Sequence, residues 1–159
     1  MSTYVFGYGS LINMNNNIEL TNHLNKKSCP VIIKGAKRSL NGMGKNHKVF
    51  GIKDVKTSFC NGILFKVNEK DMEYLINRES LYAIKQIAKN RILFDYKKTI
   101  NFKSNDKIIT FYPDTKYVLT KKQLSLNPIS SKYLNICIEG ASSLGDDFLQ
   151  DFTEMTHGL

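Results

Sequence analysis

Short apolar runs separated by turn-forming residues fill the first two thirds of the chain and predict β-strands. Residues 62–67 alternate in polarity, begin at an Asn-Gly pair and end before Asn68, which is typical of a strand. Between the strands we expect a loop at 13–17, a short helix at 18–24 and a turn at 42–44. The expected strands are residues 3–8, 31–34, 49–53, 62–67, 83–96 and 107–112, the fifth open to an interruption.

Asn68 is expected to begin a helix, with Asp71 three residues on in a capping-box arrangement. Apolar residues then follow at i, i+3 and i+4, namely Met72, Leu75 and Ile76. Glu79 occupies position i+7 of the same face, so the periodicity puts a carboxylate on the side that should pack against the core. An acid there either pairs with a cation, such as Arg78 or Arg38, or takes part in chemistry.

The last third of the chain is expected to be helical after Pro128. One apolar stripe ends at Gly145 and contains Leu134, Cys137, Ile138, Ala141 and Leu144. Asp146 can cap a final helix whose apolar positions are Phe148, Phe152 and Met155. Strands followed by helices indicate an α+β fold, a curled sheet or small barrel with helices packed outside. Without repeats or linkers, residues 1–159 are expected to form one domain.

The charge of the chain changes this picture little. The formal net charge of +9 comes from 20 Lys and 3 Arg spread along the sequence, and the longest basic clusters are pairs. Nucleic-acid-binding modules cluster Arg and Lys on one face, so a solvated surface is favoured over a nucleic-acid site. No apolar stretch approaches the length of a membrane helix, and the early first strand leaves no room for a signal peptide. We therefore expect a cytoplasmic monomer or homodimer that binds neither nucleic acid nor membrane.

Two features suggest chemistry. A strand that runs into Tyr8-Gly9-Ser10-Leu11 offers backbone N–H groups to a carboxylate or an oxyanion, although a strand-ending glycine is the simpler interpretation. Glu79 is the stronger candidate, because Glu is seldom buried without a purpose. Desolvation would raise its pKa, which suits a group that accepts and donates a proton, whereas a structural ion pair is the alternative.

Other chemistries find less support. Ser10 does not lie in a Gly-x-Ser-x-Gly elbow, and the pair Gly42 and Gly44 lacks the third glycine of a dinucleotide fingerprint. Cys137 falls on an apolar stripe and Cys60 in a strand, so a thiol nucleophile is an outside alternative. The three cysteines are too widely spaced for a disulfide framework, and the three histidines lack metal-ligand spacing, so no cofactor and no metal are expected.

Three segments together resemble the γ-glutamylcyclotransferase superfamily, which includes the ChaC-type and AIG2-like proteins. Residues 4–11, YVFGYGSL, resemble its N-terminal substrate loop. Residues 61–82, NGILFKVNEKDMEYLINRESLY, resemble its strand-helix segment that ends in Arg-Glu and a Tyr. Residues 128–141, PISSKYLNICIEGA, resemble its C-terminal helix. The order and separation of the segments fit, and the resemblance spans nearly the whole chain.

The resemblance implies a small mixed β-barrel with flanking helices and a site for γ-glutamyl compounds. Glu79 falls at the position of the catalytic acid/base, and the N–H groups of Tyr8, Gly9, Ser10 and Leu11 would hold the γ-glutamyl moiety. Arg38 and Tyr82 are further implied substrate-binding residues, and Tyr133 resembles the tyrosine of the C-terminal helix.

The implied reaction is an intramolecular cyclisation that needs no metal and no nucleophilic side chain. The substrate's α-amine attacks its own γ-carbonyl and releases 5-oxoproline and an amine or amino acid. Glutathione, γ-glutamyl-amino acids, γ-glutamyl-amines and a biosynthetic γ-glutamyl protecting group all remain open as substrates. A non-catalytic γ-glutamyl-binding protein of the same fold is the alternative.

Overall fold

A computed structural model describes residues 1–16, 28–44, 47–113, 119–126 and 128–158. The helix expected at 18–24 lies outside the described residues. The strands are β1 Thr3–Gly7, β2 Cys29–Met43, β3 Lys48–Val67, β4 Tyr82–Ile87, β5 Ile92–Leu93, β6 Lys107–Pro113 and β7 Thr156–His157. The α-helices are α2 Glu69–Arg78, α3 Lys121–Leu126, α4 Ser131–Ser143 and α5 Asp146–Glu154. Short 3-10 turns span Ser10–Ile12, Met14–Asn16 and Lys89–Arg91.

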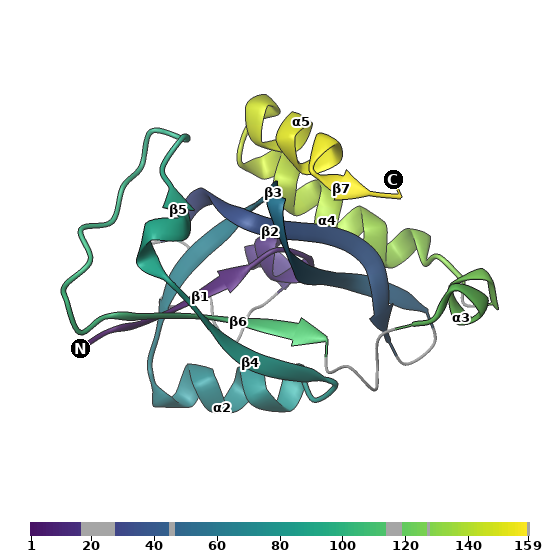
Figure 1. The fold of residues 1–159 in the computed structure, drawn as a ribbon, viewed down its shortest axis with the longest axis horizontal. Coiled ribbons are helices and arrows are strands. Elements are labelled where there is room, and N and C mark those ends of the chain that lie inside the picture. The colour runs from purple at the N-terminus through teal and green to yellow at the C-terminus, as the bar shows by residue number, and fades with distance from the viewer. Residues whose placement is uncertain (17–27, 45–46, 114–118, 127, 159) are drawn as a thin grey trace.

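One curled, mixed sheet forms the centre of the molecule. Its strand order is β4-β6-β1-β3-β2-β5, and β7 pairs with β2. β1 is antiparallel to β3 and parallel to β6, so the sheet is mixed at its middle strand. In Figure 1 the sheet curls into a half-barrel, with α2 on one side and α4 and α5 on the other. This confirms the prediction of an α+β fold with a small mixed barrel and flanking helices.

The long hairpin of β2 and β3 corrects the predicted strand lengths. The segments expected at 31–34, 49–53 and 62–67 are parts of these two strands, which pair almost throughout. Polar residues in the middle of β3 are exposed, yet their backbone stays in the ladder, and hydropathy does not register backbone pairing. A register shift between Lys34 and Ala36 is accommodated by Gly35, whose φ is +83°, a value that favours glycine.

Helix α2 begins as the sequence predicts and ends earlier than its periodicity suggests. Asn68 is the N-cap and forms a complete capping box with Asp71. Leu75 is fully buried, whereas Ile76 is 50% exposed, so the apolar face is narrower than expected. Glu79 is the C-cap residue rather than part of the helix. The interruption expected within 83–96 is confirmed by the 3-10 turn between β4 and β5.

The two C-terminal helices close the core. Ser130 caps α4 by accepting a hydrogen bond from the Tyr133 amide, and Cys137 and Ala141 of its apolar stripe are buried. Ile138 of the same stripe is 39% exposed. Gly145, with a φ of +107°, occupies the N-cap of α5, so the prediction that Asp146 caps this helix is wrong. The expected core residues of α5, Phe148 and Phe152, are buried. No described helix has the length and hydropathy needed to cross a membrane.

A buried arginine joins the sheet to the last helix. Arg38 of β2 is fully buried, and its guanidinium lies 3.9 Å from the centre of the Phe152 ring. It donates to five oxygens, which are Tyr8 O at 3.1 Å, Asn61 O at 2.6 Å, Asn61 Oδ1 at 2.8 Å, Phe152 O at 3.0 Å and Thr156 Oγ1 at 2.7 Å. Among the described residues, no carboxylate pairs with Arg38. Carbonyl dipoles and an aromatic face therefore stabilise its charge.

Replacement of Arg38 tests this role. Arg38→Met should lower the free energy of unfolding by at least about 3 kcal/mol, because buried oxygens lose their donors. Lys34→Met removes a cation from an exposed position of the same strand and should change it by less than about 0.5 kcal/mol. Urea denaturation monitored by circular dichroism measures both changes. Equal stability of the two variants would contradict the role.

Candidate functional site

A cavity lies where the end of β1, the end of α2, β3 and α4 meet. Its volume is about 320 Å³, including the space open to solvent. Its lining consists of Phe6, Tyr8, Gly9, Ser10, Leu11, Phe50, Glu79, Tyr82, Phe111 and Tyr133. Most of the lining residues are aromatic, and Glu79 is the only one among them with a carboxyl group, so one carboxyl group shares the cavity with aromatic rings.

The segment after β1 is held tightly by its neighbours. The amides of Ile12 and Asn13 donate to the carbonyls of Gly9 at 3.0 Å and Ser10 at 3.1 Å, forming the 3-10 turn Ser10–Ile12. The amides of Gly9 and Leu11 take no part in the hydrogen bonds of this turn. The Tyr8 carbonyl accepts from Arg38, and the Tyr8 hydroxyl donates to the Phe111 carbonyl. The backbone donors expected from the sequence thus lie on a fixed framework.

Space around Gly9 is limited as well. A Cβ atom at this position would lie 3.1 Å from the Tyr133 hydroxyl and 3.5 Å from Phe50 Cβ. Any side chain here would crowd the hydroxyl of Tyr133, which lines the cavity. The absence of a side chain thus leaves the backbone of Gly9 open toward the cavity.

Glu79 is a partly desolvated acid at the junction of α2 and β4. Its amide donates to the Leu75 carbonyl at 2.8 Å and its carbonyl accepts from the Tyr82 amide at 3.0 Å, which fixes its backbone. Its side chain is 15% exposed and forms an ion pair with Arg78. Burial raises the pKa of Glu79 above its usual value, while the charge and hydrogen bond of Arg78 act in the opposite direction. The Glu79 carboxyl group therefore holds its proton to a higher pH than an ordinary surface Glu does.

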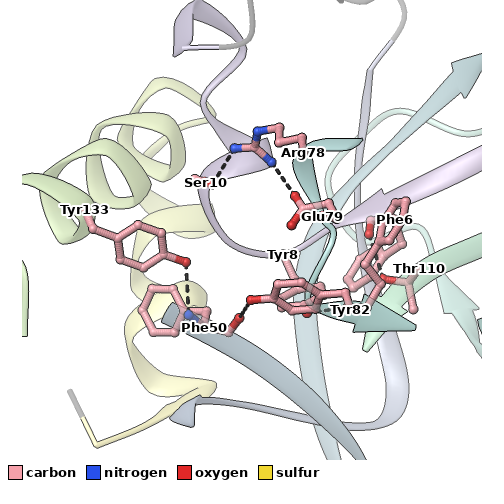
Figure 2. A network of polar contacts seen from close by, with 10 residues as sticks. Phe6, Tyr8, Ser10, Phe50, Arg78, Glu79, Tyr82, Thr110 and Tyr133 are labelled. Atoms are coloured by element: carbon pink, nitrogen blue, oxygen red, sulfur yellow. Dashed lines mark hydrogen bonds and ion pairs between the residues drawn. The ribbon is translucent and has the colours of Figure 1, made fainter. Parts of the chain in front are cut away.

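Arg78 connects this acid to the N-terminal loop. One terminal nitrogen bonds to Glu79, and Nη2 donates to Ser10 Oγ at 2.7 Å. Figure 2 shows the guanidinium between the two partners, above the tyrosines of the cavity. Of the two cations that the sequence offered as partners of Glu79, the structure therefore selects Arg78, and Arg38 is engaged elsewhere.

Two tyrosines are tied to the backbone of one strand residue, Phe50. The Tyr82 hydroxyl donates to the Phe50 carbonyl at 2.8 Å, and the Tyr133 hydroxyl accepts from the Phe50 amide at 3.0 Å. In Figure 2 they approach Phe50 from opposite sides. Burial raises the pKa of both phenols well above the usual value, so both stay neutral at physiological pH. The Tyr133 hydroxyl also has a second hydrogen-bond partner, the buried Cys137 thiol.

Most of the residues predicted from the sequence meet in this cavity. Tyr8, Gly9, Ser10, Leu11, Glu79 and Tyr82 all line it, and so does Tyr133. Arg38 does not, because its fully buried guanidinium is bound to the framework behind the loop. The interpretation of Arg38 as a substrate-contacting residue is therefore corrected to a framework role. Three aromatic residues, Phe6, Phe50 and Phe111, were missed, since buried strand residues carry no polar signal that separates a site from a core.

The cysteines and possible metal ligands lie apart from this chemistry. Cys60 and Cys137 are fully buried, and burial raises the pKa of both thiols, that of Cys137 to about 12. Thiols in such surroundings are inert nucleophiles. Within the part of the chain that the structure describes, no group of three or more His, Cys, Asp or Glu side chains is arranged to hold a metal ion.

Comparisons with known proteins rest on structure alone. No family model matches the chain, and no curated protein matches it. YkqA from Bacillus subtilis superposes with a TM-score of 0.68 at 17% identity, over 99% of this chain and 55% of its own. A γ-glutamyl cyclotransferase structure gives a TM-score of 0.68 at 15% identity, over 98% of this chain and 88% of its own. The chain has the γ-glutamylcyclotransferase-like fold.

A third similar structure is that of a glutathione-specific protein. The yeast γ-glutamyl cyclotransferase specific to glutathione superposes with a TM-score of 0.53 at 13% identity, over 99% of this chain and 98% of its own. At these identities the γ-glutamylcyclotransferase-like fold is shared, and the chain spans about half the length of YkqA. The chemistry of the site must be argued from its own residues.

The raised pKa of Glu79 has a consequence for stability that does not depend on activity. Between the usual Glu pKa of about 4.3 and the higher pKa of the folded protein, the unfolded chain has released this proton while the folded protein still holds it. Rising pH therefore favours the unfolded chain over this range, and the folded protein loses stability. Glu79→Gln cannot ionise. Its free energy of unfolding, relative to wild type, should therefore increase between about pH 4 and about pH 7. Urea denaturation at several pH values measures this, and a relative decrease would show that Arg78 outweighs burial.

Proposed function

We propose that the protein is a γ-glutamylcyclotransferase, which converts a γ-glutamyl compound to 5-oxoproline and a free amine or amino acid. The observation that carries this proposal is a single carboxyl group with a raised pKa that lines the same small aromatic cavity as Gly9 and Leu11. The shared fold supports it, because structural neighbours include γ-glutamyl cyclotransferases. The cavity offers one acid/base group and backbone donors, which is what an intramolecular cyclisation requires.

The cyclisation begins with the substrate's α-amine, which is mostly protonated near neutral pH. Ionised Glu79 removes a proton from it, and the amine nitrogen then attacks the γ-carbonyl carbon of the same molecule. A new C–N bond closes the five-membered ring, and the carbonyl oxygen takes the negative charge. Both reacting groups belong to one molecule, so the main task of the protein is to hold the folded conformer.

The second half breaks the C–N bond to the leaving amine. The oxyanion collapses to a carbonyl, the electron pair of the broken bond goes to the leaving nitrogen, and Glu79 delivers the proton to it. The ring nitrogen then gives its second proton to Glu79, which passes it to the leaving nitrogen. The released amine is therefore an ammonium group, and Glu79 ends ionised, as it began. In this proposal the amides near Gly9 stabilise either the oxyanion or the substrate's α-carboxylate.

The direct test is 5-oxoproline release from glutathione, γ-glutamyl-amino acids and γ-glutamyl-amines. Glu79→Gln should lower kcat/KM by about a hundredfold to ten-thousandfold, because the proton-transfer group is lost. Glu73→Gln, at an exposed position of α2, is the matched control and should retain wild-type turnover. Normal turnover by Glu79→Gln would refute the acid/base role. Silence of the folded wild-type protein across the panel would favour a non-catalytic γ-glutamyl-binding protein.

Arg78 gives a second test through the pH dependence of kcat/KM. The acidic limb should follow the ionisation of Glu79, and the alkaline limb should follow the substrate's α-amine. Arg78→Met removes a charge that lowers the pKa of Glu79, so the acidic limb should move to higher pH. Arg78→Lys keeps the charge and should move it less. An acidic limb that stays in place in Arg78→Met would assign that limb to another group.

A further inference from the structure

A second, wider cavity adjoins the candidate site. Its volume is about 810 Å³, including the space open to solvent. It shares Ser10, Glu79, Tyr82 and Tyr133 with the inner cavity, so the two adjoin at the carboxyl group. Its other lining residues are Met43, Gly44, Val49, Arg78, Ser80 and Leu81. A ligand that occupies the inner cavity therefore has room to extend past Glu79.

The walls of this outer cavity are mainly apolar. Met43 and Val49 come from the end of the β2–β3 hairpin, and Leu81 comes from the turn between α2 and β4. All three side chains are half-buried, so each has a solvent-accessible face for a ligand. Such a surface favours an apolar group over a strongly hydrated one.

Charge in the outer cavity is already compensated. Among its described lining residues only Arg78 and Glu79 are charged, and they pair with each other. Both terminal nitrogens of Arg78 are engaged, one by Glu79 and one by Ser10. A carboxylate entering this space would lose its hydration beside a pair whose charges offset each other, with no net positive charge from the described lining residues to compensate.

The orientation of the substrate rests on the proposed function. The γ-glutamyl head must place its α-amine at Glu79 and its γ-carbonyl near the backbone donors, which lie in the inner cavity. The leaving group is attached to the γ-carbonyl and is the one part that varies between γ-glutamyl compounds. In this orientation the leaving group extends past Glu79 into the adjoining outer cavity.

We propose that the outer cavity selects the leaving group, and that the preferred substrates are γ-glutamyl-amines whose amine is apolar and lacks a carboxylate. Leu81, Met43 and Val49 are the specificity-determining residues. γ-Glutamyl-amino acids and glutathione, whose leaving groups end in a carboxylate, are the poorer substrates. The preference comes from the cost of removing water from the carboxylate, which the neutral Arg78–Glu79 pair does not offset, rather than from lack of space.

A matched pair of substrates isolates the carboxylate. γ-Glutamyl-phenethylamine and γ-glutamyl-phenylalanine differ only in the carboxylate on the leaving group. The kcat/KM for 5-oxoproline release should be about tenfold higher for the amine. Equal or higher kcat/KM for γ-glutamyl-phenylalanine would overturn the proposal.

Variants of Leu81 test whether this wall sets the preference. Leu81→Lys places a cation in the outer cavity, whereas Leu81→Gln introduces polarity without charge. The ratio of kcat/KM for γ-glutamyl-phenylalanine over γ-glutamyl-phenethylamine should rise at least about threefold more in Leu81→Lys than in Leu81→Gln. Equal ratios in the two variants would show that Leu81 does not face the leaving group.

Failure of the specificity proposal and failure of the proposed function give different results. Cyclisation of γ-glutamyl-phenylalanine in preference to the amine leaves the proposed function in place and overturns the specificity. Absence of 5-oxoproline from both compounds and from glutathione, with the protein folded, overturns the proposed function and the specificity with it.

Discussion

The buried guanidinium of Arg38 is the interaction on which the rest of the structure depends. It bonds to the carbonyl of Tyr8 in the candidate site, to Asn61 in the central strand, and to Phe152 and Thr156 at the C-terminal end. A single side chain thus joins three parts of the chain that are far apart in sequence. Because it is fully buried, releasing one acceptor would leave an unpaired group in the core, so the three parts must form together.

In the candidate site, the backbone of Phe50 likewise joins side chains from distant parts of the chain. Its carbonyl and amide bond to Tyr82 and Tyr133, which come from β4 and α4. Backbone groups of a central strand move little, so the two phenols are held at set positions without charged partners. The cavity is therefore preorganised by neutral hydrogen bonds, and Glu79 and Arg78 are left as its charged pair. This arrangement suits a reaction in which the substrate supplies both reacting groups.

Local signals in the sequence predicted much of this, and long-range pairing explains what they missed. The capping box of Asn68, the buried Phe148 and the strand before Gly9 were predictable because each depends on neighbouring residues. The full lengths of β2 and β3 were not, since exposed polar residues in β3 stay in the sheet through backbone bonds alone. Arg38 was predicted to contact the substrate because its partners Asn61 and Thr156 are distant in sequence and meet it only in the folded protein. Phe50 was missed for the same reason.

Under the proposed function, few side chains are indispensable to the chemistry. Backbone amides near Gly9 persist whatever side chains surround them, and cyclisation needs one proton-transfer group. The remaining constraint is electrostatic. Glu79 must be desolvated enough to keep a raised pKa, yet close enough to Arg78 to ionise before the substrate's amine does. A change in either burial or Arg78 would disturb that balance, whereas the outer cavity can vary without affecting it, so specificity and chemistry can diverge separately.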